Sequence, residues 1–157
     1  MRKIVFILLL YFSFINQVFS ENVIDGDTLK INNIIYRIYG IDAPEKNQTC
    51  STRNYNWACG LVATNELIKL VAGEEIICKK ISKDRYNRII AKCFVNRIDI
   101  GKTMVNSGWA LAYRQYSLDY INQEERAKSM KLGIWSSKFI VPWKWRNLSR
   151  ESKKIRE

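Results

Sequence analysis

The chain has 157 residues, and its 26 lysine and arginine residues against 15 aspartate and glutamate residues give a net charge of +11. This length suits a single domain, and a hydrophobic content of 47% is enough to form a buried core. The sequence contains no histidine. That absence excludes Ser-His-Asp and Cys-His catalysis, histidine zinc sites and imidazole general bases. The positive charge favours a polyanionic partner or an anionic membrane surface.

The N-terminal segment has the layout of a secretory signal peptide. A basic start precedes an apolar run from Ile4 to Ile15, and small residues at Val18 and Ser20 precede a possible cleavage site. A membrane anchor is the alternative, but a membrane span needs about 20 apolar residues. We therefore expect residues 1–20 to be removed, which leaves a secreted or periplasmic protein that starts near Glu21 and has no stable membrane association.

Export explains the four cysteines, because an even number in an exported chain is typical of disulfides. Cys78 and Cys93 lie in two strand-like runs on either side of the polar segment 82–87. A hairpin centred on that segment would place these two cysteines opposite each other, within disulfide reach. Cys50 and Cys59 would then form the second bridge. A zinc site built from all four cysteines is the alternative, but the sequence contains no C-x-x-C pair.

The apolar pattern predicts strands separated by turns, together with helices. Five strand-like runs with a helix after the second resemble the elements of a small OB-type barrel, and an α+β sandwich is the alternative. A charged C-terminal tail is expected at 148–157. The expected elements are strands over 23–31 and 34–41, a helix from Trp57 ended by Gly73, a hairpin over 75–95, a helix over 102–106, an extended piece over 109–113, and a helix over 119–132 with Asp119 as its N-cap and Gly133 as its stop.

Four carboxylates gather near the start of this basic chain: Asp25, Asp27, Asp42 and Glu45. If the first two strands pair through the turn at 32–33, Asp27 lies opposite Ile38 and about 13 Å from Asp42 along the ladder. A flat hairpin therefore would not bring the carboxylates together, and strong curvature or a bulge is needed, for which Gly26 and Gly40 are candidates. The alternative is that these residues are ordinary turn and strand-end residues.

Two arginines stand in positions that suggest phosphate binding. Arg37 interrupts an aliphatic run, which costs free energy unless the side chain has a use or points outward. Arg88 ends the polar hairpin segment DRYNR at 84–88. Guanidinium groups match phosphate oxygens bidentately and remain protonated, so the two arginines could hold one phosphate. An ordinary charged hairpin tip is the alternative for the second segment.

These motifs resemble the staphylococcal nuclease (thermonuclease) family of secreted calcium-dependent nucleases. The resemblance implies an α+β fold, a five-stranded OB-type β-barrel with about three α-helices, and we expect this nuclease domain over residues 21–147. Barrel closure in this fold would bring the acidic strand ends together. The matching blocks keep their order and spacing along the chain: VIDGDT at 23–28, YRIYGIDAPE at 36–45, DRYNR at 84–88, SGWALAY at 107–113 and GIWS at 133–136.

The resemblance implies a Ca²⁺ site. Its carboxylate ligands would be Asp27 and Asp42, and its main-chain carbonyl ligand would be Ala43. The best-known members of the family have threonine at this last position; alanine keeps the carbonyl and lacks the hydroxyl. Ca²⁺ accepts such an oxygen-only, flexible set of ligands.

The resemblance also implies the remaining roles. Glu45 would act as general base or water orienter, with Arg37 and Arg88 stabilising the phosphate. The expected activity is a monomeric endonuclease that cleaves the 5′ P–O bond of DNA and RNA, prefers single strands and leaves 3′-phosphate ends. A non-catalytic nucleic-acid-binding OB-fold module is the alternative, which the complete set of site residues disfavours. The expected nucleotide contacts are Arg85, Tyr86 and Tyr113.

Overall fold

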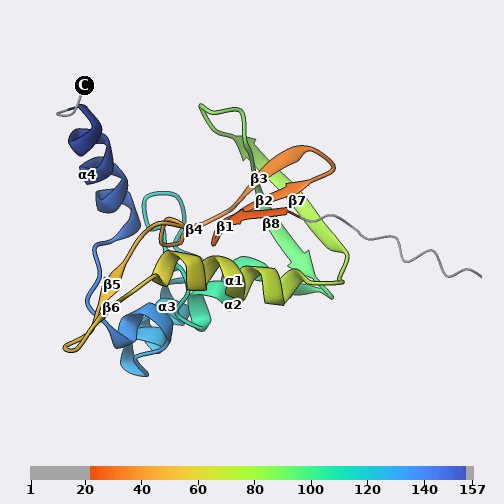
Figure 1. The fold of residues 1–157 in the computed structure, drawn as a ribbon. Coiled ribbons are helices and arrows are strands. Elements are labelled where there is room, and N and C mark those ends of the chain that lie inside the picture. Colours follow the sequence, from red (N-terminus) through yellow and green to blue (C-terminus); the bar gives the residue numbers. More distant parts are fainter. Residues whose placement is uncertain (1–21, 155–157) are drawn as a thin grey trace, which may run out of the picture.

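The computed structural model describes residues 22–154. The predicted signal peptide at 1–20 lies outside the described residues. The predicted α+β fold is confirmed: a mixed sheet lies against helices α1 and α2, and α4 stands at the far left of the molecule (Figure 1). The elements in chain order are β1 (Asn22–Asp25), β2 (Thr28–Ile31), β3 (Ile34–Ile38), β4 (Ile41–Asp42), β5 (Cys50–Ser51), β6 (Asn56–Trp57), α1 (Cys59–Val71), β7 (Ile76–Lys83), β8 (Ile89–Val95), β9 (Ile98–Asp99), α2 (Ile100–Asn106), β10 (Leu111–Ala112), α3 (Ile121–Ser129), a 3-10 turn (Gly133–Ser136) and α4 (Pro142–Lys154).

The main sheet has the strand order β1-β2-β3-β8-β7, and β9 pairs with β8 at one end. Strands β3 and β8 run parallel, whereas the other neighbours in the sheet are antiparallel. This path contains the five strands that a small barrel needs. Among the pairings of the described residues, none joins β1 to β7 and so closes the barrel by hydrogen bonds.

The first predicted strand is interrupted, and this correction matters for the site. The run 23–31 breaks at Gly26 and Asp27, so that β1 and β2 form a tight hairpin of their own. A side chain at Gly26 would press on the methyl groups of Ala43 and Ala63, so only glycine allows the turn to pack this closely. The predicted register of the next hairpin is confirmed, because the Ile38 amide donates to the Asp27 carbonyl oxygen at 2.8 Å.

The predicted helices are present, but they begin or end at other residues than the sequence predicts. Helix α1 starts two residues later than predicted, and Gly73 follows its end with φ +74°, as a left-handed stop requires. Helix α2 starts two residues earlier, after Asp99, whose side chain caps it. The N-cap of α3 is Tyr120; the prediction of Asp119 was wrong. The Asp119 carboxylate instead pairs with Lys92 at 2.5 Å, which anchors it to the sheet.

Both predicted disulfides are confirmed. Cys50 and Cys59 are bridged with their Cα atoms 5.6 Å apart, and Cys78 and Cys93 are bridged across the β7–β8 hairpin at 4.0 Å. The pairing of Cys78 with Cys93 follows the predicted register, which shifts by one residue only near Ile81. The zinc alternative is excluded, because all four cysteines are bonded to each other.

A second hydrophobic cluster lies beside the main core. It is centred on the Cys50–Cys59 bridge with Leu111 and Ile134, and it receives half-buried aromatic rings. Trp57, Trp109 and Trp135 pack there, as expected for core tryptophans. The same cluster includes Trp143 at the start of α4 and thereby ties the C-terminal segment to the domain.

Helix α4 differs most from the sequence-based prediction. The tail expected from Leu148 onward is the second half of this helix, up to Lys154. The domain has four α-helices among its described residues where about three were expected. No helix within residues 22–154 combines the length and the apolar character needed to cross a bilayer.

The start of α1 is packed directly on the loop that carries Glu45. A Cβ atom on Gly60 would overlap with the Glu45 carbonyl oxygen. We therefore expect Gly60→Ala to lower the free energy of unfolding by about 1–3 kcal/mol, as overpacking does. Urea unfolding measures this change. Leu61→Ala, at an exposed position of the same turn, serves as the control, and equal stability of the two variants would contradict the expectation.

Candidate functional site

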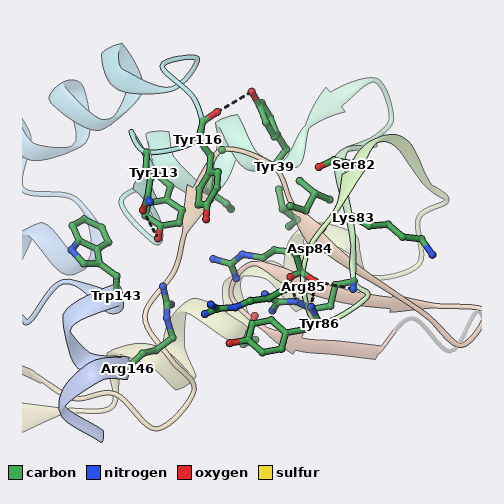
Figure 2. Close-up of a pocket in the computed structure, with 18 of the residues that line it drawn as sticks. Tyr39, Ser82, Lys83, Asp84, Arg85, Tyr86, Tyr113, Tyr116, Trp143 and Arg146 are labelled. Carbon is green, nitrogen blue, oxygen red and sulfur yellow. Dashed lines mark hydrogen bonds and ion pairs between the residues drawn. The ribbon is translucent and has the colours of Figure 1, made fainter. Parts of the chain in front are cut away.

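A cleft of about 1070 Å³ lies between the end of β3, the β7–β8 turn and α4 (Figure 2). The predicted metal ligands Asp27, Asp42 and Ala43 are buried and do not line it. The cleft gathers side chains from several segments that lie far apart in the chain, and its lining residue Arg37 binds both predicted carboxylate ligands. Its lining includes every predicted catalytic and nucleotide-contacting residue: Arg37, Glu45, Arg85, Tyr86, Arg88 and Tyr113.

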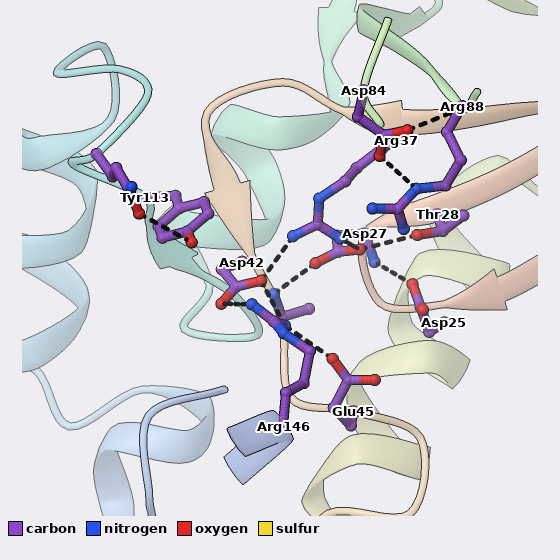
Figure 3. A network of polar contacts seen from close by, with 12 residues as sticks. Asp25, Asp27, Thr28, Arg37, Asp42, Glu45, Asp84, Arg88, Tyr113 and Arg146 are labelled. Carbon is purple, nitrogen blue, oxygen red and sulfur yellow. Dashed lines mark hydrogen bonds and ion pairs between the residues drawn. The ribbon is translucent and has the colours of Figure 1, made fainter. Parts of the chain in front are cut away.

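A buried network joins the predicted metal ligands (Figure 3). The side chains of Asp27 and Asp42 have exposed fractions of 3% and 0%. The Arg37 guanidinium bridges them: Nη1 donates to Asp27 Oδ1, and Nη2 donates to Asp42 Oδ1 at 2.6 Å. The Ala43 amide also donates to Asp27 Oδ2 at 2.9 Å. The two carboxylates thus meet around one guanidinium, although a flat ladder would hold them apart.

A reversal of the backbone after β3 brings Asp42 back. Strand β3 ends at Ile38, and Gly40 has φ +74°, a conformation that glycine adopts without strain. The chain then leaves the main sheet as β4, which pairs with β10, and the Tyr113 amide donates to the Gly40 carbonyl oxygen at 2.9 Å. Gly26 and Gly40 were the two candidates for the curvature that brings the carboxylates together. Gly40 makes the reversal, whereas Gly26 leaves room for the side chain of Ala43.

Burial and neighbouring charges shift the pKa values of Asp25, Asp27 and Asp42 in different directions. Burial alone would raise the pKa of Asp27, but Arg37 and the Ala43 amide outweigh it and hold this pKa below its ordinary value. Burial, and then the charge of Asp27, raise the pKa of Asp25 to about 7. The same two causes raise the pKa of Asp42 against the guanidinium groups that bind it. Of these three aspartates, Asp27 is therefore the most firmly ionised.

Arg146 of α4 completes the network, although it was not among the residues predicted from the sequence. Its guanidinium binds both oxygens of Asp42 at 2.9 Å and donates to Glu45 Oε1 at 2.8 Å. The only signal in the sequence is an arginine placed three residues after Trp143 in a charged segment. That signal is weak, because Arg146 meets Asp42 across 104 positions of the chain.

The hairpin tip holds the second predicted arginine. Asp84 Oδ1 accepts from the amides of Tyr86 and Arg88, both at 2.9 Å, and Asp84 Oδ2 binds Arg88 Nε at 2.7 Å. These bonds order the turn and direct Arg88 into the cleft that Arg37 also borders. The Tyr86 ring lies 5.0 Å from the Arg85 guanidinium carbon and is more than half exposed.

A buried glutamate positions Tyr113. Glu124 of α3 is 1% exposed, and its carboxylate accepts from the Ala112 amide at 3.1 Å and binds Arg114 and Lys128. Charge-assisted contacts of this kind are stronger than those between neutral groups. The segment that carries Tyr113 is therefore held against β4, next to Asp42.

The residues of this network suit a hard cation. Within the described part of the chain, no three His, Cys, Asp or Glu side chains cluster as a metal site. The predicted set, however, uses only two carboxylates, Asp27 and Asp42, with the main-chain carbonyl of Ala43. All three are oxygen donors, which Ca²⁺ prefers. The cationic guanidinium of Arg146 between Asp42 and Glu45 shows that this position favours positive charge.

Comparison with known proteins identifies the family. Residues 36–137 match the family model described as staphylococcal nuclease homologue. The chain belongs to this family. The matched segment contains the motifs at 36–45, 84–88 and 107–113, whereas the turn with Asp27 and helix α4 lie outside it.

Several curated proteins are similar over most of the chain. A protein named uncharacterized endonuclease from Haemophilus influenzae is 35% identical over 78% of this chain and 68% of its own length. Protein ParB of Escherichia coli is 29% identical over 86% of this chain and 80% of its own length. The staphylococcal-like nuclease CAN1 of Arabidopsis thaliana is 29% identical over 73% of this chain and 33% of its own length.

Arg146 should stabilise the fold as well as the site. Arg146→Gln removes the guanidinium contacts of a fully buried carboxylate on Asp42, and hydrogen bonds to charged groups contribute about 1.5–3 kcal/mol. We expect the free energy of unfolding, measured by urea denaturation in chelator, to fall by about that amount. Lys144→Gln removes an equal charge from an exposed position of the same helix and should leave stability unchanged. Equal effects of the two changes would contradict the expectation.

Proposed function

We propose that the protein is an exported Ca²⁺-dependent endonuclease that hydrolyses phosphodiester bonds of DNA and RNA. The carrying observation is that Arg37, Glu45 and Arg88, three residues from separate segments, line one cleft above a buried pair of carboxylates. Membership in the nuclease family and the endonuclease names of relatives support a nuclease function. Two disulfides support export, because such bonds persist in oxidising compartments.

Glu45 is the proposed base. Its side chain borders the cleft and is about 30% exposed, so water can reach it. One of its oxygens is held by Arg146 at 2.8 Å, which fixes the carboxylate toward Asp42. In a chain without histidine, a carboxylate in this position is the group best suited to orient the attacking water and take its proton.

Arg37 and Arg88 are the proposed phosphate-stabilising groups. Arg37 is anchored by two carboxylates, and Arg88 is anchored through Nε by Asp84, so both guanidinium groups are preorganised before substrate arrives. A guanidinium has five N–H donors, and these anchors use only some of them. The remaining donors can stabilise charge that develops on the phosphate oxygens, which is where preorganised contacts contribute most.

Asp27, Asp42 and the main-chain carbonyl of Ala43 would hold the Ca²⁺ ion, which when bound supplies Lewis-acid activation of the phosphodiester. We propose cleavage of the 5′ P–O bond with 3′-phosphate products, and a monomer that prefers single strands. The excess of positive charge would attract the substrate from solution and make its binding sensitive to salt. Arg85, Tyr86 and Tyr113 would contact the nucleotides.

Removal of divalent cations tests the Ca²⁺ requirement. We expect the purified protein to degrade single-stranded DNA with added Ca²⁺ and to stop when a chelator is present, because the two buried carboxylates need a cation to act on the phosphate. Gel analysis of a labelled oligonucleotide measures both states. Activity that persists unchanged in chelator would exclude the metal role.

Replacement of Glu45 separates a nuclease from a non-catalytic binding module. We expect Glu45→Gln to lower turnover by about 10²–10⁴-fold, as loss of a general base does, while nucleic-acid binding in chelator persists. Initial rates and anisotropy measure the two properties. Glu66→Gln, which only loses an exposed ion pair with Lys69, is the control. Turnover near that of the unmodified protein would remove Glu45 from its proposed role.

A further inference from the structure

Helix α4 is a fixed wall of the cleft, although the family match ends at residue 137. The segment before it is fastened to the disulfide-bonded region. Ser51 and Lys138 exchange two backbone hydrogen bonds of 2.8 Å, and the Gln48 side chain donates to the Ile140 carbonyl oxygen at 2.5 Å. Trp143 adds its ring to the second hydrophobic cluster. The position of α4 is therefore set by several contacts outside the helix itself.

One face of α4 is turned to the cleft. The cleft-lining residues of the helix are spaced by three, four and seven positions, which places them on a single helical stripe. Lys144, by contrast, is exposed and does not line the cleft. Figure 2 shows two residues of this stripe, Trp143 and Arg146, across the cleft from the β7–β8 turn. The stripe consists of Trp143, Arg146, Asn147 and Arg150.

Trp143 extends an aromatic surface inside the cleft. Its ring is stacked on that of Tyr113, with centroids 5.6 Å apart and planes 16° apart. The ring of Tyr116 packs edge to face against the ring of Tyr113, with the two centroids 4.9 Å apart. Aromatic faces in a basic cleft are the surface on which unpaired nucleic-acid bases stack, and such stacking tolerates any base sequence.

Arg150 adds positive charge at the opposite end of the stripe. The Arg85 guanidinium carbon lies 5.0 Å from the centre of the Tyr86 ring on the opposite wall. Arg150 and Tyr86 both line the cleft, one from α4 and the other from the β7–β8 turn. A nucleic-acid strand that runs along the cleft from Glu45 would thus meet the guanidinium groups of Arg85 on one wall and of Arg150 on the other.

We infer that α4 is a substrate-binding wall of the nuclease, in which Trp143 stacks an unpaired base next to the phosphate to be cleaved and Arg150 binds a neighbouring phosphate. The ligand is a single-stranded nucleic acid. This inference rests on the proposed function and extends it to residues outside the matched family segment.

The test is binding of a fluorescent single-stranded oligonucleotide, measured by anisotropy in chelator so that no cleavage occurs. Trp143→Leu should weaken binding about 5- to 150-fold, the range for loss of one stacked base, and should leave binding of a duplex nearly unchanged. Arg150→Gln should reduce the slope of log affinity against log salt by about 0.7 on the single strand. Lys144→Gln is the matched charge control and should leave affinity and slope as in the unmodified protein.

Trp143→Phe distinguishes the loss of base stacking from the loss of packing, because it keeps an aromatic ring at the cleft while reducing the buried volume. It should bind the single strand more tightly than Trp143→Leu. Equal loss in the two variants, or equal slopes for Arg150→Gln and Lys144→Gln, would overturn the role of α4. If the unmodified protein cleaves DNA normally while the α4 variants bind as it does, this inference fails alone. If the unmodified protein neither binds nor cleaves, the proposed function fails as well.

Discussion

The structure depends on one arginine held between two buried carboxylates. Asp27 and Asp42 are almost completely removed from solvent, and two uncompensated negative charges at such depth would be strongly unfavourable. The Arg37 guanidinium offsets this cost by binding one oxygen of each. Asp27 sits in a hairpin turn and Asp42 follows a backbone reversal. The guanidinium therefore fixes two irregular segments against each other, together with the Ala43 amide that donates to Asp27.

A second set of contacts completes the site from the far end of the chain. The Cys50–Cys59 bridge anchors a cluster of aromatic rings, and that cluster seats the segment that leads into α4. Helix α4 then delivers Arg146 to Asp42 and Glu45. The disulfide, the tryptophans and the site are therefore parts of one arrangement: without the second cluster, the C-terminal wall of the cleft would lack its support.

Local patterns predicted much of the fold because they depend on neighbouring residues. The register of β2 with β3 and the pairing of Cys78 with Cys93 follow from turn position and strand alternation, and both are confirmed. The predictions were wrong where tertiary contacts override local preference. The strand over 23–31 breaks at Gly26 because Ala43 packs against the turn, and Asp119 leaves its capping position because Lys92 binds it.

The sequence by itself determined the chemistry available to this protein: carboxylates and arginines without histidine, an excess of positive charge, and two disulfides whose partners the spacing indicates. It also supplied the motifs that place the chain in its family. Only the tertiary structure decided how Asp27 and Asp42 meet across a distance that a flat ladder does not span, and that Arg146 reaches them from α4. The reason is physical: the energies of these buried charges depend on distances set by packing between segments far apart in the chain, and no local pattern encodes those distances.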